Sequence, residues 1–399
     1  MSLSLCARTS AIAPSATLAI TARANQLKAE GYPVIGFGVG EPDFNTPKHI
    51  CDAAVEALNK GMTRYTAAAG TLELRKAICD KLLRDNGLSY QPNEIVVSNG
   101  AKHALYNICC ALINPGDEVL LPAPYWVSYV EMIRLAGGVP VIIEGRPEDD
   151  FIVTAEMMRP YVNEKTKALI LNSPNNPNGC VWHPDELKAI AELAVEKQFY
   201  VISDEIYEKL IYDGEEHVSI ASFGDAIKGQ TIVVNGVSKS YAMTGWRIGY
   251  VAGPAKIMKV ISSFQSHTAS APNAMAQYAS IEALNGGDES IIAMHDEFDR
   301  RRQLIVSLIN GIEGLSARKP KGAFYVMMDV SSLFGKSHGG KVIHDVSEFG
   351  QALLDSKYVA VVPGVAFGDD RHVRMSYATS SENIREGLRR IAEFVSEIE

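Results

Sequence analysis

The fold expected for this chain of 399 residues rests on the segment Asn235-Gly-Val-Ser238-Lys239-Ser-Tyr-Ala-Met-Thr-Gly-Trp-Arg247-Ile-Gly-Tyr250. The β-branched run Thr231-Ile-Val-Val234 precedes it and predicts a buried strand. This strand would carry Ser238 and Lys239 into a turn that contains glycine. Because α/β proteins place their chemistry at the ends of such strands, Lys239 is the candidate catalytic residue.

Lys239 has neighbours that favour a nucleophilic amine. Shelter by Tyr241, Met243 and Trp246 would remove water from the ammonium group and leave a neutral amine that can form a Schiff base. Arg247 offers a planar fork of donors suited to phosphate. The pair indicates a lysine joined to pyridoxal phosphate, with the phosphate held nearby. The alternative is that Lys239 is a solvated surface lysine and that Arg247 pairs with a carboxylate.

This segment resembles the lysine signature of the fold-type I, class I pyridoxal-phosphate aminotransferases, and the resemblance runs from about Pro14 to the end. It is strongest for the bacterial-type group of aspartate and prephenate aminotransferases. The resemblance implies an α/β fold, in which a large domain with a mostly parallel seven-stranded sheet between helices is joined to a smaller α/β domain. Strands that alternate with helices from Glu94 to Pro254 fit this expectation.

The break Asn285-Gly-Gly-Asp288 predicts a domain boundary. The resemblance also implies an N-terminal segment, 1–45, that packs with the small domain. A large cofactor-binding domain would span 46–288, and a small C-terminal domain would span 289–399.

The resemblance assigns the cofactor phosphate to three groups of donors. Ser238 and Arg247 belong to the lysine segment. The turn Gly100-Ala101-Lys102 follows the predicted strand Glu94–Ser98, and the backbone N–H groups at the start of the next helix suit an anion. Tyr65 would reach the phosphate of the neighbouring subunit, which implies a homodimer with shared active sites. Without the resemblance, Tyr65 would be an ordinary loop aromatic residue.

The cofactor ring is assigned to residues that follow other predicted strands. Trp126 would stack on the ring, although a tryptophan there is equally typical of a core. Asn176 and Tyr207 would bond the phenolic oxygen. Asp204 would hold the ring nitrogen protonated, because an ion pair in a low dielectric favours both charged forms. The alternative for Asp204 is a helix cap.

Substrate contacts are also carried over from the resemblance, on Arg374 for the α-carboxylate and on the backbone at Gly40. Arginine suits a carboxylate because its fork makes two parallel hydrogen bonds. The full set expected to touch substrate is Gly40, Trp126, Asn176, Arg374, Thr17 and Lys102. The resemblance also implies cis peptide bonds at Ala123-Pro124 and Asn176-Pro177.

The implied reaction is a ping-pong amino transfer between small-molecule amino acids and 2-oxo acids, through a Lys239 aldimine and pyridoxamine phosphate. Thr17 and Lys102 match positions that recognise a distal carboxylate, with complementarity to the phosphate as the alternative for Lys102. Two departures weaken this assignment, since no arginine lies between Ser262 and Pro272 and Ala13 stands where many relatives have lysine.

We rank aspartate:2-oxoglutarate transfer first and glutamate or aspartate transfer to prephenate second. Aromatic or alanine transfer ranks third. A carbon-sulfur lyase could use the same cofactor residues, and a non-catalytic cofactor-sensing domain ranks last.

Composition excludes several other classes of function. The formal charge of −9 argues against a nucleic-acid partner. No apolar run reaches the roughly 20 residues that span a bilayer, so we expect no membrane partner. Six scattered cysteines without a Cys-x-x-Cys pair, and no His-Glu-x-x-His motif, predict neither disulfides nor a metal site. We read Pro14-Ser-Ala-Thr17 as a retained site-lining segment and expect a cytoplasmic protein.

Overall fold

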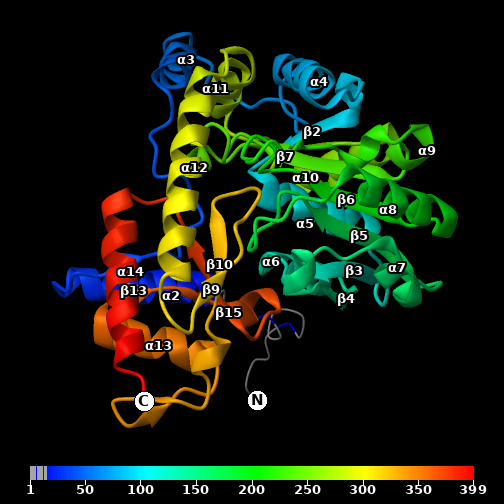
Figure 1. Ribbon diagram of the computed structural model, residues 1–399. Coiled ribbons are helices and arrows are strands. Elements are labelled where there is room, and N and C mark those ends of the chain that lie inside the picture. Colours follow the sequence, from blue (N-terminus) through cyan, green and yellow to red (C-terminus); the bar gives the residue numbers. More distant parts are fainter. Residues whose placement is uncertain (1–5, 7–11, 13–15) are drawn as a thin grey trace, which may run out of the picture.

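The computed structural model describes Cys6, Ile12 and residues 16–399. Its larger body is built on a seven-stranded sheet in the order β2-β8-β7-β6-β5-β3-β4 (Figure 1). The strands are β2 (Ile95–Ser98), β3 (Glu118–Ala123), β4 (Val139–Glu144), β5 (Thr166–Asn172), β6 (Tyr200–Asp204), β7 (Thr231–Gly236) and β8 (Gly249–Ala252). Only β8 runs antiparallel to its neighbours, so the expected mostly parallel sheet is confirmed.

Alternating side chains of each strand pack into different layers, as the two-residue period of a strand requires. Val119 of β3 and Ile170 of β5 pack with α5 (Ala101–Leu112), α6 (Ser128–Leu135) and α10 (Ala255–Thr268). Their neighbours Leu120 and Leu169 pack with α7 (Ala155–Met158), α8 (Pro184–Lys197) and α9 (Asp225–Lys228). Burial on both faces explains the continuous apolar runs that predicted the sheet.

A third layer of helices covers the β2 end of the sheet. It contains α3 (Lys48–Asn59), α4 (Leu72–Asn86) and α11 (Ala274–Asn285), whose buried side chains meet Val97 and Tyr250. The sequence sets the ends of α4. The Thr71 hydroxyl accepts a hydrogen bond from the Leu74 N–H at 3.3 Å, and Gly87 ends the helix in a left-handed conformation with φ 66°.

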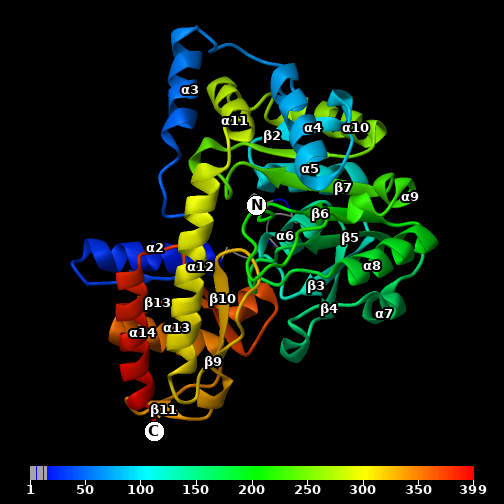
Figure 2. The same cartoon turned by 45° about the horizontal axis from the view of Figure 1, so that its top comes forward.

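The smaller body has a four-stranded antiparallel sheet, in the order β14-β15-β10-β9. These strands are β9 (Ser316–Ala317), β10 (Tyr325–Asp329), β14 (Val362–Pro363) and β15 (His372–Ser376). The helices α13 (Val346–Lys357) and α14 (Ser381–Ser396) lie beside it, and a short hairpin joins β11 (Ser337–His338) to β12 (Lys341–Val342). The long helix α12 (Glu289–Asn310) runs from the α3–α11 end of the molecule down to α13 (Figures 1 and 2).

The N-terminal elements join the C-terminal ones. β1 (Ile35–Gly36) pairs in parallel with β13 (Val359–Ala360), and α2 (Ala16–Ala29) supplies Ala24 and Leu27 to a small core with Leu354. One bond also links the two parts directly, because the Arg374 guanidinium donates to the Gly38 carbonyl at 2.8 Å.

The positions of the cis peptide bonds correct one expectation. Ala123-Pro124 is cis as predicted, but the second cis bond is Ser173-Pro174, whereas Asn176-Pro177 was predicted. The turn-rich loop after β5 contains two prolines, and its local sequence pattern does not show which of them follows a cis peptide bond. From residue 16 onward, no helix has the length and apolar character needed to cross a membrane. The structure describes all six cysteines, and none of them forms a disulfide.

Candidate active site

A cavity of about 240 Å³ lies at the carboxyl ends of β5 and β6, the edge at which open α/β sheets bind their ligands. It brings together most residues predicted from the sequence: Gly40, Ala101, Lys102, Trp126, Asn176, Asp204, Tyr207, Ser238, Lys239, Arg247 and Arg374. These residues come from both bodies, so the site forms only when the two bodies pack together.

Lys239 points into this cavity from the turn that follows β7. Its amine donates a hydrogen bond to the Gly40 carbonyl at 2.5 Å, and burial lowers the pKa of Lys239 to about 8. The nearest rings belong to Tyr207 and Phe324, whose centroids both lie 5.9 Å from Nζ. A buried amine with a depressed pKa is the form that attacks a carbonyl carbon.

The prediction that Tyr241, Met243 and Trp246 shelter Lys239 is wrong. Tyr241 and Met243 belong to the core beneath α3, α4 and α11, and Trp246 packs against that core. The sequence places them near Lys239, but the turn directs them away from the cavity. Tyr207 and Phe324 take their place from distant parts of the chain, so local sequence could not identify them.

Arg247 closes one end of the cavity and faces the start of α5. Its Nη1 donates to the Thr244 carbonyl at 2.9 Å, and a Cβ added at Gly100 would come 2.3 Å from its Nη2. A Cβ added at Gly249 would come 2.2 Å from the Ala101 nitrogen. No ion pair among residues 16–399 involves Arg247, so the carboxylate-partner alternative fails. The guanidinium, the Ser238 hydroxyl and the helix N-terminus form a cradle for an anion.

Asp204 ends β6 and is only 3% exposed. Burial raises its pKa to about 6, while the Tyr129 hydroxyl, which donates to Oδ2 at 2.7 Å, favours the ionised form. The N–H of Ile206 donates to Oδ1 at 3.2 Å, but a turn follows Asp204, and so it does not cap a helix as the alternative required. A buried carboxylate of this kind suits a protonated nitrogen as its partner.

Arg374 reaches the cavity from β15 and is fully buried. Its Nη1 donates to the Asn176 side-chain oxygen at 2.9 Å, while its buried Nε has no partner. The rings of Tyr325 and Phe367 lie 4.5 and 4.8 Å from the guanidinium carbon. A buried arginine without a carboxylate partner and with an unused donor is prepared to bind an anionic ligand.

Lys102 and Trp126 form the wall beside α5. The Lys102 amine lies 4.7 Å from the centroid of the Trp126 ring, and burial, followed by the nearby Arg247 charge, lowers the pKa of Lys102. Trp126 meets Tyr129 edge to face, with centroids 5.3 Å apart. Lys102 is therefore a further cation of the cavity beside Arg247 and Arg374, and Trp126 lines the cavity without being a core residue.

Tyr65 lies apart from the other predicted residues, and the role of Thr17 stays a prediction. Tyr65 is 96% exposed and lines no part of this cavity. Thr17 lies in the first turn of α2, and its side chain falls outside the described part of the structure. The other predicted residue, Gly100, supports the cradle through its missing side chain.

Three residues of the site were missed. Tyr129 bonds Asp204, and the Tyr325 hydroxyl lies 2.9 Å from that of Tyr207. Asn172 accepts from the Asn176 N–H at 2.9 Å and donates to the Asp204 carbonyl at the same distance. Asn172 could have been predicted from the sequence, because it is a polar residue at the end of a buried strand. Tyr129 and Tyr325 carry no local signal that separates them from core aromatic residues.

The fold and cavity define a class of enzyme in which a buried lysine amine faces an anion cradle, a buried carboxylate and a second anion-binding arginine. The sequence model of the family described as Aminotransferase class I and II matches residues 32–391. The chain belongs to this family.

Three relatives place the chain within the family. It is 49% identical to an aspartate aminotransferase of Bacillus sp. (strain YM-2), over 97% of this chain and 98% of the relative. It is 48% identical to a probable aspartate/prephenate aminotransferase of Aquifex aeolicus, with 99% of both chains covered. The solved structure of the aspartate aminotransferase from Rhizobium meliloti superposes with a TM-score of 0.97 at 42% identity, and covers 100% of both chains.

Proposed function

We propose that the protein is a pyridoxal-phosphate-dependent aspartate aminotransferase, which transfers the amino group of aspartate or glutamate to 2-oxoglutarate or oxaloacetate. The observation that carries this proposal is the Lys239 amine, held at a pKa of about 8 in a cavity that also contains Asp204, Arg247 and Arg374. Family membership and the names of the relatives support the same reaction.

The residues present fit the cofactor. Its phosphate would lie in the cradle of Ser238, Arg247 and the start of α5, where Gly100 leaves room for the guanidinium. Its ring nitrogen would pair with Asp204. Asn176 and Tyr207 would contact the phenolic oxygen, and Trp126 would lie against the ring. Bound there, the cofactor would supply a carbonyl carbon for the amine and a ring that withdraws electrons from the substrate.

The chain's own groups then have separate tasks. Lys239 would anchor the cofactor and afterwards, as a free amine, move the proton at the substrate Cα. Arg374 would hold the α-carboxylate with its unused donor, beside the Gly40 carbonyl. With the α-carboxylate held by Arg374, the Cα–H bond would face the freed Lys239 amine, which aligns it for proton transfer.

Lys102 supports the choice of dicarboxylates. Lys102 is a cation in the cavity, and burial lowers its pKa. A substrate carboxylate beside it would stabilise the ammonium form that burial disfavours. We propose that Lys102, with Thr17, binds the distal carboxylate. Prephenate, the second candidate acceptor, also carries a second carboxylate, and the name of the Aquifex aeolicus relative favours testing it.

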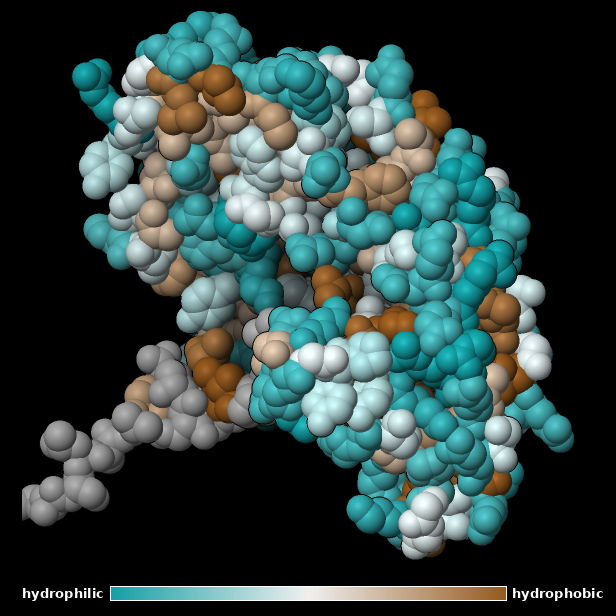
Figure 3. Space-filling view, turned by 90° about the vertical axis from the view of Figure 1, so that its left-hand side faces the viewer, coloured by the Kyte–Doolittle hydropathy of each residue, from teal (hydrophilic) through white to brown (hydrophobic). Residues whose placement is uncertain are grey.

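We also propose a homodimer with shared active sites. Tyr65 is 96% exposed, and its loop is held by buried amides, since Gln277 bonds Thr66 and Thr71 while Gln265 bonds the Ala68 carbonyl. Figure 3 shows hydrophobic side chains at the upper end of the molecule, the end at which α3 lies in Figure 1. Val55 and Leu58 of α3 are 54% and 50% exposed. A second copy would cover them and receive Tyr65.

We further propose a cytoplasmic location, which the cysteines without disulfides support.

The test is the half-reaction followed by absorbance. The holoenzyme is titrated separately with aspartate, glutamate, phenylalanine and alanine, and the band of the bound cofactor is followed. The proposal is supported if only aspartate and glutamate convert the cofactor band and 2-oxoglutarate reverses the conversion. Reversal by prephenate alone would instead support transfer to prephenate, the second candidate. Lys239→Ala should retain the cofactor without turnover. Conversion by alanine or phenylalanine instead would contradict the dicarboxylate assignment, and normal turnover of Lys239→Ala would overturn the role of the lysine.

A further inference from the structure

Residues 204–208, at the end of β6 and just after it, direct their side chains to two different places. Asp204 and Tyr207 line the cavity, whereas Glu205 and Glu208 do not, although they are only 1% and 9% exposed. Residues 206–209 form a turn. Two backbone hydrogen bonds close the turn, from the Glu208 N–H to the Glu205 carbonyl at 3.0 Å and from the Leu210 N–H to the Tyr207 carbonyl at 2.8 Å.

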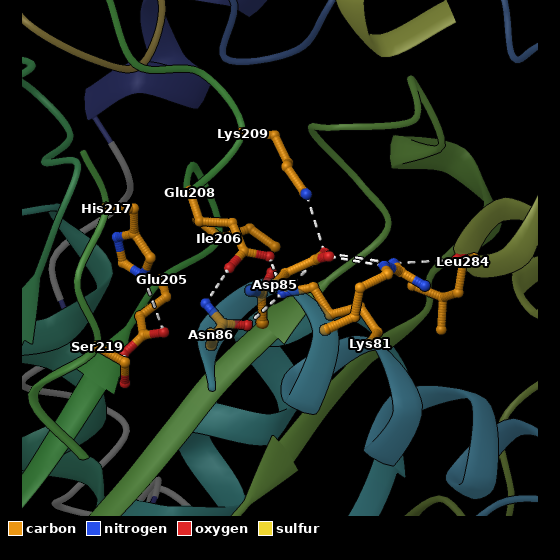
Figure 4. Close-up of polar contacts among 12 residues, drawn as sticks. Lys81, Asp85, Asn86, Glu205, Ile206, Glu208, Lys209, His217, Ser219 and Leu284 are labelled. Atoms are coloured by element: carbon orange, nitrogen blue, oxygen red, sulfur yellow. Dashed lines mark hydrogen bonds and ion pairs between the residues drawn. The ribbon is translucent and has the colours of Figure 1, made fainter. Parts of the chain in front are cut away.

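Glu205 is fixed by three donors from one side. Its Oε1 accepts from the Ser203 hydroxyl at 2.8 Å and from the Ser219 hydroxyl at 2.6 Å. Its Oε2 lies 3.1 Å from His217 Nε2 (Figure 4). Glu205 raises the pKa of His217, although burial of the imidazole opposes this. The carboxylate is therefore satisfied by neighbours that do not touch the cavity.

The Glu208 carboxylate is held by two side chains of α4. It is paired with the Lys81 amine, which is 2% exposed, and its Oε2 accepts from the Asn86 side chain at 2.8 Å (Figure 4). Lys81 also donates to the Asn86 oxygen at 2.8 Å. Although burial opposes its ionisation, the Lys81 charge holds the pKa of Glu208 at about 2. Removal of Lys81 would leave the buried Glu208 carboxylate without its ion-pair partner.

Glu205, Glu208 and His217 offer ligand atoms within 4.8 Å of one another, which raises the question of a metal ion. The Lys81 ammonium already pairs with Glu208, and Glu205 is bonded to two hydroxyls and an imidazole. A divalent cation would have to displace these donors and would be repelled by the ammonium. The cluster is better explained as a network of internal partners, in which the buried His217 Nδ1 alone of the three ligand groups keeps an atom without a hydrogen-bond partner among the described residues.

We propose that Glu205 and Glu208 are positioning residues, whose buried networks fix the end of β6 and the turn 206–209, and so present Asp204 and Tyr207 to the cofactor. The inference rests on the proposed function, because the cofactor contacts of Asp204 and Tyr207 do. Asp204 would be held through the adjacent Glu205, and Tyr207 through the adjacent Glu208. Displacement of Glu205 would shift the Asp204 carboxylate at the strand end, and displacement of Glu208 would shift the Tyr207 hydroxyl in the turn.

The first test compares Glu205→Ala with Glu205→Gln. Glutamine retains an oxygen that can accept from Ser203 and Ser219, whereas alanine removes every anchor. Glu205→Ala should raise the dissociation constant of pyridoxal phosphate at least about tenfold, in line with other outer-shell changes. It should also shift the pH midpoint of the cofactor absorption band, lower kcat and leave KM for aspartate nearly unchanged. Glu205→Gln should restore the dissociation constant to near that of the unmodified enzyme.

The second test uses Glu208 and its partner. Glu208→Ala leaves the buried Lys81 ammonium with the Asn86 oxygen at 2.8 Å and the more distant Asp85 carboxylate at 3.9 Å, and should weaken cofactor binding as Glu205→Ala does. The double variant Lys81→Met/Glu208→Met removes both charges and refills the space, so it should recover the fold and most of the cofactor affinity. Recovery of the melting temperature without recovery of affinity would contradict a purely positioning role for Glu208.

The control is Arg302→Met, which removes a buried arginine from its bonds with the part-exposed Asp213 and Asp299, a network that does not touch Glu205 or Glu208. It should lower the melting temperature with the absorption band unchanged. Our inference is overturned if the Glu205 variants lose only stability in the same way, or if Zn²⁺ or Mg²⁺ alone stabilises the unmodified enzyme through this cluster. Failure of the unmodified protein to bind pyridoxal phosphate would instead overturn the proposed function.

Discussion

At the scale of single residues, the site depends on groups whose ionisation has been shifted by burial. Lys239, Lys102 and Asp204 all lie in one cavity, and burial disfavours the charge on each of them. Sequence could predict Lys239 and Asp204, because each follows a recognisable strand. It could not predict Tyr129, which controls Asp204 from a helix 75 residues away.

The pKa of Lys239 sets a pH dependence for cofactor capture. With a pKa of about 8, the amine of the apoprotein is mostly protonated at pH 6 and mostly neutral at pH 9. The rate of pyridoxal phosphate capture should therefore rise about tenfold per pH unit below pH 8 and level off above it, as for a single titrating nucleophile. Stopped-flow absorbance measures this rate. A rise that continues to pH 10 would show an unshifted lysine.

Tyr129→Phe should weaken the pairing of Asp204 with the cofactor. Loss of the 2.7 Å bond removes a donor that favours the ionised carboxylate, so the pKa of Asp204 should rise further above its usual value. A hydrogen bond to a charged group contributes about 1.5–3 kcal/mol, and kcat should fall roughly tenfold or more. Tyr90→Phe is the control, because the buried Tyr90 hydroxyl has no partner among the described residues. Equal kinetics for both variants would contradict the role of Tyr129.

Lys102→Ser tests the distal-carboxylate assignment. Steady-state kinetics with aspartate and with alanine should show a KM for aspartate raised roughly tenfold, since a charged hydrogen bond is lost, and a KM for alanine nearly unchanged. If KM rises equally for both substrates while cofactor affinity falls, Lys102 serves the phosphate instead.

At the scale of elements, most of the sheet could be predicted from its β-branched runs, because burial on both faces leaves a continuous apolar signal. The predicted strands Glu94–Ser98 and Thr231–Val234 correspond to β2 and β7, and the candidate residues at or after the ends of β5, β6 and β7 do lie together. The shelter of Lys239 and the second cis bond were predicted wrongly. Both depend on how a loop turns, which the spacing of apolar residues does not determine.

The contact between the start of α5 and Arg247 predicts a strict need for glycine. Gly100→Ala combines a strained φ of +84° with a Cβ that would overlap the Arg247 guanidinium, so the cradle must open. Cofactor affinity should fall at least about tenfold, measured by equilibrium titration of the apoprotein. Gly61→Ala is a matched control, because Gly61 has φ +70° and open space around it. It should cost about 1 kcal/mol of stability and leave cofactor affinity unchanged.

At the scale of the whole molecule, the cavity joins residues from both bodies, and α12 runs along them. We propose the division into 1–45, 46–288 and 289–399 as the domain organisation. The pairing of β1 with β13 supports placing the first segment with the last. Long-range pairing of this kind has no local sequence signal, and the resemblance to known aminotransferases alone suggested it.

Shared sites predict complementation between defective subunits. Lys239→Ala removes the lysine of its own site, and Tyr65→Ala would damage the site of its neighbour. When the two variants are mixed and allowed to exchange subunits, hybrid dimers gain one site with neither defect, so activity should exceed that of either parent. Subunit exchange is checked by native mass spectrometry. Hybrids without any gain in activity would show that Tyr65 belongs to its own subunit's site or to none.

The bond from Arg374 to the Gly38 carbonyl joins residues 336 positions apart. On the ribosome, Gly38 emerges early and its partner emerges only when nearly all of the chain has been made. The large sheet can form while synthesis continues, but the wall of the cavity that contains Arg374 must wait. Each new subunit therefore passes through a stage in which the lysine pocket stands open on one side, and nascent chains should acquire substrate binding last.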